Sequence, residues 1–287
     1  MALHPTSLAT RIGQQRVLSS NASLLLCAVI AVFTIACPAR SSDTASAALA
    51  FCQEADKPIT LNPYRTMLNS DKTVLCFDGS IPKEPELGGF ESLRDDGYFV
   101  VRSAGGDVAA AIEIANLIQR KNATVIIYDY CLSACANYFL VASKQTYVAK
   151  RSIVAWHGGP TDLFRNCEHR DSLNILIDAI ASKSFLSEME QVCAVVKLSA
   201  EFFRQRRLDS DFIYRPQSPR TKKDYASLTT KMSESARNSV GWMWNPRYYR
   251  GYFGDRHLTY QLYPKSQGEV DEVLKKAGIQ ARIIYDP

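Results

Sequence analysis

The clearest pattern of hydrophobic and polar positions lies in the middle of the chain. Tyr98–Arg102 is a short β-branched and aromatic run and Ala123–Tyr128 is a second one, so both are predicted strands. Between them, apolar residues recur at helical spacing as far as Arg120, at Val108, Ile112, Ile114, Ala115 and Ile118. Continuous apolar strands that alternate with an amphipathic helix are typical of a parallel sheet covered on both faces. We therefore predict an α/β domain with a mainly parallel central sheet flanked by helices.

The same patterns predict most of the remaining elements. They are a helix over Ser133–Ser143, short strands over Gln145–Ala149 and Ser152–Trp156, a long helical stretch over Asp171–Val196, a separate helix over Ser199–Arg207, a helix over Glu269–Gly278 and a final strand over Ala281–Tyr285. The segment Arg215–Asn238 is polar and basic, so we expect a solvated loop there.

Residues 40–85 differ from the rest of the chain. They contain strand-like pieces such as Thr73–Phe77 among turns rich in Pro and Asn. We assign them to an N-terminal elaboration. Residues 86–287 would then form the α/β domain, with a polar insertion at about 215–240.

The N-terminal segment has the pattern of an export signal. Arg11 and Arg16 precede the apolar run Leu24–Cys37, and a small, polar stretch follows. This run is shorter than the roughly 20 residues that a bilayer span needs, so residues 1–39 are predicted to be a signal peptide. An uncleaved N-terminal anchor and lipidation of Cys37 are the alternatives. Three positions suit cleavage: Ala36, Ala39 and Ala50.

Charge and composition narrow the class of protein. Hydrophobic residues make up 46% of the chain and charged residues 22%, which suits a folded domain and excludes wholesale disorder. The net charge is +5, but residues 1–40 hold three arginines and no carboxylate, leaving 31 basic against 29 acidic residues beyond them. A surface for binding nucleic acid is therefore not expected.

Six cysteines follow the predicted signal peptide: Cys52, Cys76, Cys131, Cys135, Cys167 and Cys193. An even number in an exported chain permits three disulfides, although six cysteines allow fifteen connectivities. Our hypothesis pairs neighbours: Cys52 with Cys76, Cys131 with Cys135 and Cys167 with Cys193. The alternative is a zinc set of Cys131, Cys135, His157 and Cys167. Its spacing matches no common zinc ribbon, and an oxidising compartment consumes thiolates, so we expect no metal and no other cofactor.

Familiar nucleotide, metal and hydrolase motifs are absent from the sequence. It contains no GxGxxG, no GxxxxGK[ST], no HExxH and no GxSxG. What remains is a set of features in a fixed order. They are a Gly-Gly turn after a strand, a serine that opens a helix, a histidine that ends a strand and aspartates further on: Gly105 and Gly106, Ser133, His157, then Asp209 and Asp211.

These residue types support nucleophilic catalysis. A serine hydroxyl is a weak nucleophile until a histidine removes its proton, and a carboxylate then orients that imidazole. Ser133, His157 and an aspartate would take these roles. The N–H of Ala134 at a helix start, and that of Gly106 at the carboxyl end of a strand, would bind an oxyanion.

Each residue also has an ordinary structural interpretation. Gly105 and Gly106 suit a strand-to-helix turn, Ser133 suits a helix N-cap, and His157 suits a core or loop position. His169 and His257 have no matching context, and we expect them at the surface. The order of the four features favours the catalytic interpretation.

Two segments carry a resemblance to a known family: VVRSAGGDVAAAIEIANLI and CLSACANYFLVASKQTYVAKRSIVAWHGG. They resemble the ClpP-type serine peptidases of the ClpP/crotonase superfamily, and more closely the exported ClpP-like serine peptidase-like proteins of Gram-negative bacteria, over roughly Phe90–Tyr214. The resemblance implies a fold of repeated ββα/βαβ units and a Ser-His-Asp triad. It assigns the nucleophile, the base and the orienting carboxylate to Ser133, His157 and Asp211, with Asp209 as the alternative carboxylate. It assigns the oxyanion hole to Gly106 and Ala134, with Gly105 adjacent.

The chain departs from the family pattern near the nucleophile. Ala104 replaces a proline, Asp129 replaces a glycine, and Cys131 and Cys135 take positions that small residues normally hold. A disulfide between these cysteines would shape the turn that carries Ser133, or mark a changed pocket.

The first functional hypothesis is an exported serine hydrolase, specifically a peptidase, located in the periplasm or anchored in the inner membrane facing it. Its partners would be a peptide or protein substrate and further copies of itself, with membrane association only if the N-terminal segment is uncleaved or lipidated. The alternative is a catalytically inactive ClpP-fold binding or scaffolding protein of the periplasm, for which the aromatic group Trp242–Phe253 would hold a ligand. Acyl-CoA chemistry of the crotonase type is a third hypothesis, but an exported protein rarely meets a CoA ester.

Overall fold

The computed structural model describes residues 40–54, 64–158, 167, 183–214, 216–237 and 239–287. The predicted signal peptide, residues 1–39, lies outside the described residues. Arg40–Pro287 forms one unit. Among the described helices, none is both long enough and apolar enough to span a membrane.

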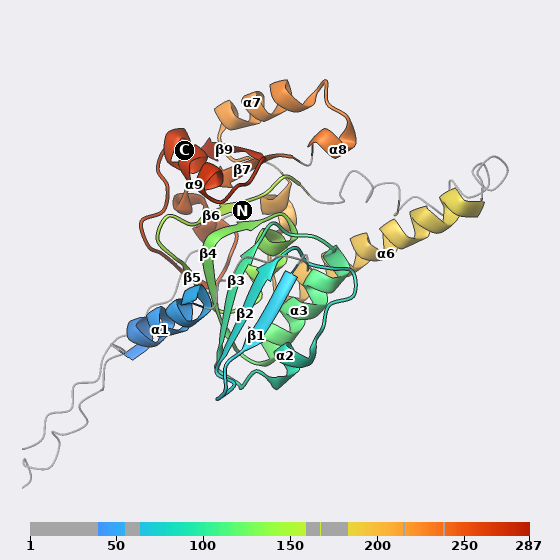
Figure 1. Ribbon diagram of the computed structural model, residues 1–287. Coiled ribbons are helices and arrows are strands. Elements are labelled where there is room, and N and C mark those ends of the chain that lie inside the picture. Colours follow the sequence, from blue (N-terminus) through green and yellow to red (C-terminus); the bar gives the residue numbers. More distant parts are fainter. Residues whose placement is uncertain (1–39, 55–63, 159–166, 168–182, 215, 238) are drawn as a thin grey trace, which may run out of the picture. The chain divides into compact units, whose positions relative to one another are not determined.

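A mainly parallel sheet forms the centre of this unit (Figure 1). Its seven strands are β1 (Tyr64–Leu68), β2 (Val74–Gly79), β3 (Tyr98–Ser103), β4 (Thr124–Leu132), β5 (Gln145–Val148), β6 (Ile153–Ala155) and β8 (His257–Tyr260). The order is β1-β2-β3-β4-β5-β8, and β6 pairs with β4. β1 and β2 are antiparallel, whereas the other pairs are parallel. This confirms the predicted α/β class. It also places β2, from the predicted N-terminal elaboration, inside the central sheet.

Both faces of the sheet are covered, as the continuous apolar strands predicted. Helices α2 (Gly88–Ser92), α3 (Val108–Arg120) and α6 (Lys183–Gln205) belong to the side onto which Phe77, Phe99 and Val125 point. Helix α1 (Arg40–Glu54) packs on the other side, against Val100 and Ile126. Neighbouring residues of a strand point to opposite faces, so strands buried on both sides need apolar residues at every position.

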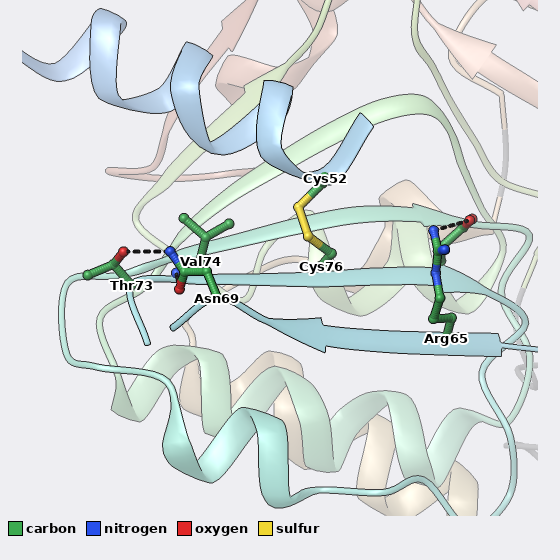
Figure 2. Close-up of a disulfide and its surroundings, with 7 residues drawn as sticks. Cys52, Arg65, Asn69, Thr73, Val74 and Cys76 are labelled. Carbon is green, nitrogen blue, oxygen red and sulfur yellow. Dashed lines mark hydrogen bonds and ion pairs between the residues drawn. A yellow bond between two sulfur atoms is a disulfide. The ribbon is translucent and has the colours of Figure 1, made fainter. Parts of the chain in front are cut away.

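The three disulfides have the pairing that the sequence hypothesis proposed: Cys52–Cys76, Cys131–Cys135 and Cys167–Cys193. Figure 2 shows the first of them joining α1 to β2. At the start of β2, the Asn69 side chain accepts a hydrogen bond from Val74 N at 2.8 Å. In a chain-entropy model, a closed separation of 24 residues stabilises the fold by about 3.5 kcal/mol and a separation of 4 by about 2 kcal/mol. Of these two bonds, the one between α1 and β2 is therefore the larger contributor to global stability.

The two helices predicted over Asp171–Val196 and Ser199–Arg207 are wrong as separate elements. Helix α6 runs without a break over Lys183–Gln205, while 168–182 lies outside the described residues. The sequence between the two predicted helices holds no Gly or Pro to end a helix. Ser199, the first residue of the second predicted helix, is buried, and its hydroxyl hydrogen-bonds the Tyr138 hydroxyl at 2.8 Å.

The prediction of a solvated loop over Arg215–Asn238 is also wrong. The segment contains α7 (Pro219–Thr229) and α8 (Glu234–Arg237). Ser218 caps α7 by accepting a hydrogen bond from Thr221 N, and the proline at the first helical position is pre-set for a helix. The buried carboxylate of Asp286 accepts from the N–H of Ser218, which fixes the start of α7. This long-range contact is invisible in the local sequence.

The C-terminal part of the chain also forms a second, two-stranded sheet. It pairs β7 (Val240–Trp244) with β9 (Arg282–Asp286), and η3 (Pro246–Gly251) and α9 (Gln267–Lys276) lie between them in sequence. The helix and strand predicted at the C-terminus are confirmed. The aromatic group Trp242–Phe253 contributes Trp242, Trp244 and Phe253 to the core, each at most 2% exposed, so these three rings do not form a ligand surface.

Candidate active site

The site is built at the end of β4, where this strand bends and changes its pairing partner. Val125–Ile127 pair with β5, whereas Tyr130–Leu132 pair with β6. Against β3 the register shifts from Val101↔Ile127 to Ser103↔Cys131. Asp129 lies in this irregularity with φ of 53°, in the left-handed region that residues with a side chain rarely adopt. The bend gives the last residues of β4 a new neighbour, β6.

An arginine of the neighbouring strand holds the bend. Arg102 donates two hydrogen bonds to the buried carboxylate of Asp78 on β2, at 2.8 and 2.6 Å. It also donates to Asp129 at 3.1 Å, and its guanidinium lies over the ring of Tyr128. A bidentate pair with a buried carboxylate is geometrically specific. Arg102 therefore couples three adjacent strands at the point where β4 turns.

Ser133 and His157 are brought together by the parallel pairing of β4 with β6. Leu132 stands opposite Ala155, and Ser133 N donates to Ala155 O at 3.0 Å, which continues the ladder beyond both strands. The two strands end at the same edge, one and two residues before the functional side chains. His157 Nε2 lies 2.6 Å from Ser133 Oγ. The two predicted site residues thus form a hydrogen-bonded pair 24 residues apart in sequence.

The backbone of Ser133 has an unusual conformation. Its φ is 55°, and the chain passes at once into η1 (Cys135–Phe139), a π-helical segment. The N–H of Asn137 donates to Ser133 O at 2.8 Å, so the turn is closed by the helix that follows. A non-glycine residue in the left-handed region at a tight strand-to-helix turn projects its side chain away from both elements, and such strain is concentrated at functional sites.

The Gly105-Gly106 turn lies against the serine turn. Gly105 and Gly106 have φ of 92° and 145°, which favour glycine. A Cβ atom on Gly105 would lie 2.7 Å from Ser133 Cβ and 2.9 Å from Ala134 N, and one on Gly106 would collide with the Ile81 carbonyl. Both positions therefore require glycine for space as well as for backbone conformation.

The Gly106 N–H points away from Ile81, the residue whose main chain bonds to both sides of Gly106. Gly106 forms a parallel bridge with Ile81, in which Ile81 N donates to Gly105 O and Asp107 N donates to Ile81 O. A parallel bridge uses the groups before and after its central residue, so the central N–H faces the opposite side. Within the described part of the chain, the N–H groups of Gly106 and Ala134 donate no backbone hydrogen bond. Both are candidates for donating to an anion.

The surroundings of His157 favour the neutral form of its imidazole. Burial lowers its pKa below the ordinary value of 6.5, against a smaller opposing effect of a backbone hydrogen bond. The main chain just before His157 is held in place, because Trp156 and Trp242 exchange two main-chain hydrogen bonds at 2.9 and 2.7 Å. From α7, the hydroxyl of Tyr225 donates to His157 O at 3.3 Å. A neutral imidazole is the form that accepts a proton from serine.

The aspartates proposed for the third position follow α6. Asp211 lies in η2 (Ser210–Ile213), but its side chain is outside the described part of the structure. Asp209 is exposed. His257 is exposed as predicted, and His169 lies outside the described residues. The assignment of the carboxylate therefore stays a prediction.

The zinc alternative does not fit the structure. Cys131 and Cys135 are bonded to each other, and Cys167 is bonded to Cys193, so three of the four proposed ligands have no thiolate to offer. Among the described side chains, no group of three His, Cys, Asp or Glu is arranged to hold a metal ion.

Three residues that support the Ser133–His157 pair were not predicted from the sequence. Arg102 contacts the bend in β4, Ile81 contacts the glycine turn, and Tyr225 contacts the main chain of His157. A local signal existed for Arg102 alone, since a charged residue at the end of a buried strand calls for a partner. Ile81 and Tyr225 give no such signal because their roles depend on backbone groups far away in sequence.

Replacing Gly106 by alanine should destabilise the protein. We expect Gly106→Ala to lower the free energy of unfolding by about 2 kcal/mol or more, because the methyl group meets Ile81 and the backbone conformation disfavours alanine. Gly268→Ala in α9 is the matched control, since a Cβ there meets nothing within 4 Å. Urea denaturation measures both. Equal stability of the two variants would contradict the crowding of Gly106.

Acidification should reveal the lowered pKa of His157. Because the folded state binds the proton less readily than the unfolded state, stability should be intact above pH 6.5 and should fall as pH drops below it. The decrease should be smaller in His157→Gln than in wild type. NMR titration of the imidazole gives the pKa directly, and a value above 6.5 would contradict the effect of burial.

A comparison with protein-family models matches none of them, and a comparison with curated proteins likewise finds no match. The chemical interpretation of the site therefore depends on its geometry. The decisive geometry is a serine with left-handed backbone at a tight turn, whose Oγ lies 2.6 Å from His157 Nε2.

Proposed function

We propose that the chain is an exported serine hydrolase, specifically a peptidase, with Ser133 as nucleophile and His157 as base. The observation that carries the proposal is the 2.6 Å separation of Ser133 Oγ from His157 Nε2, at a strand-to-helix turn where the serine backbone is left-handed. Activation of a hydroxyl needs a base within hydrogen-bond reach, and this distance satisfies that requirement.

The reaction proceeds by acyl transfer. Ser133 Oγ attacks the carbonyl carbon of the substrate while its proton passes to His157 Nε2. The tetrahedral intermediate then expels the leaving amine, to which His157 returns the proton, and an acyl ester remains on Ser133. Water repeats the same steps and releases the acid. The lowered pKa of His157 supports this role because the imidazole begins the cycle unprotonated.

The oxyanion that forms during the attack would be bound by the main chain. Gly106 and Ala134 supply the two N–H groups, and Gly105 leaves the space between the two turns free of a side chain. Main-chain donors held by a packed turn need little reorganisation, and the loss of one such donor typically costs 10² to 10³ in rate.

The family and the cellular location belong to the same proposal. The parallel crossovers from β3 through α3 to β4, and from β4 through η1 to β5, support repeated units of the ClpP/crotonase type. Three disulfides are typical of an oxidising compartment. We place the protein in the periplasm, free or anchored by its N-terminal segment, with peptide or protein substrates and with copies of itself as assembly partners.

Labelling with a fluorophosphonate tests the nucleophile. We expect covalent modification of wild type, no modification of Ser133→Ala, and a rate at least about 10³-fold lower in His157→Gln, because the hydroxyl loses its base. His257→Gln and Ser227→Ala are controls at exposed positions and should label like wild type. Labelling that persists in Ser133→Ala would exclude this serine, and a folded, unlabelled wild type would favour the inactive binding protein.

Paired substitutions identify the carboxylate. Asp211→Asn should lower the labelling rate by about 10³-fold or more if Asp211 orients His157, whereas Asp209→Asn should have little effect. The reverse result would assign the role to Asp209. Wild-type rates in both variants would leave Ser133 and His157 as a dyad and would contradict the proposed triad.

A further inference from the structure

We propose that the Cys131–Cys135 disulfide is the positioning device that holds Ser133 in its reactive conformation. This inference rests on the proposed function. It concerns the reactivity of the site, whereas the other two disulfides would act on the stability of the fold.

The location of the disulfide is the first argument. Its cysteines stand two residues before and two residues after Ser133, so the covalent ring they close contains the nucleophile and Ala134. Cys131 belongs to β4, where it stands opposite Ser103 on one side and Val154 on the other. Cys135 begins η1. The bond therefore fixes the distance between the end of the strand and the start of the helix, with their Cα atoms 5.3 Å apart.

The strained backbone of Ser133 is the second argument. A residue with a side chain stays in the left-handed region only where its surroundings determine the conformation. The same stretch holds a second such residue, Asp129, and there the ion pair with Arg102 supplies the restraint. For Ser133 the restraints are its main-chain bonds to Ala155 and Asn137 and the disulfide that spans it.

The short sequence separation of the two cysteines and their burial are the third argument. A bond that closes a separation of 4 restricts the unfolded chain less than one that closes 24, so stability alone is a weak reason for it. Both cysteines are 0% exposed, which keeps the bond away from reductants in solution. A permanent local restraint fits these facts better than a redox switch.

Ala134 connects the restraint to catalysis. Its N–H belongs to the backbone segment that the disulfide closes into a ring. Its nitrogen is 2.9 Å from the place that a Cβ atom on Gly105 would occupy, so it lies close to the glycine turn. A shift of the ring would move the attacking oxygen and one proposed oxyanion donor together. Misplacement of reacting groups by about 1 Å can cost roughly 10²-fold in rate.

The experiment compares two double variants. Cys131→Ala with Cys135→Ala removes the disulfide at the nucleophile, and Cys52→Ala with Cys76→Ala removes the bond between α1 and β2 as the matched control. Both are measured well below their unfolding temperatures by the second-order rate of fluorophosphonate labelling. We expect a loss of at least about 10-fold in the first variant and a rate within about 2-fold of wild type in the control. On an ester substrate, the loss should appear in kcat with KM unchanged.

The outcomes separate this inference from the function on which it rests. An unlabelled wild type would refute the hydrolase itself. A labelled wild type together with a Cys131/Cys135 variant of the same rate would refute the positioning role alone. If the alanine pair does not fold, Cys131→Ala with Cys135→Val provides a second apolar pair of larger volume. Failure of both pairs to fold, while the control pair folds, would overturn the proposal in favour of a role in stability.

Discussion

The parallel pairing of the end of β4 with β6 is the constraint on which the candidate site depends. It aligns Leu132 with Ala155 and lets Ser133 N donate to Ala155 O, so both strands end at one edge of the sheet. Without the bend at Asp129, β4 would continue along β5, and Ser133 would emerge beside a different strand. The contact between the Ser133 hydroxyl and the His157 imidazole thus results from the change of pairing partner along β4, from β5 to β6.

Several conformations at this edge are costly, and each has an identifiable support. Asp129 and Ser133 both adopt positive φ, which costs on the order of 1 to 3 kcal/mol per residue. Arg102 holds the first through its pair with Asp78, and the Cys131–Cys135 disulfide spans the second. The glycine turn is held by its bridge to Ile81. Unfavourable backbone at this candidate site is stable because packed, distant groups determine its conformation.

Helix α7 and strand β7 support the same site from outside the central sheet. Trp242 fixes the main chain of Trp156, next to His157, and Tyr225 of α7 donates to His157 O. The buried tryptophans that suggested a ligand surface are therefore better understood as the packing that holds the histidine. Burial also lowers the pKa of His157, so the same packing that positions the imidazole keeps it neutral.

The sequence by itself predicted the β3–α3–β4 unit and singled out Ser133, His157 and six cysteines as candidates, because these predictions depend on local periodicity and on chemical type. It left the cysteine connectivity open, and the structure supplies the three pairs. We did not predict from the sequence that α6 runs through Ser199 or that Ser218 starts a helix. Both have a local signal, since no Gly or Pro interrupts the chain before Ser199 and Ser218 precedes a proline, but both also involve distant contacts. Ser199 bonds Tyr138, 61 residues away, and Ser218 bonds Asp286, 68 residues away. Only the tertiary structure decided the bend at Asp129 and the distance between Ser133 and His157, since pairing between distant backbone groups leaves no mark on the neighbouring residues.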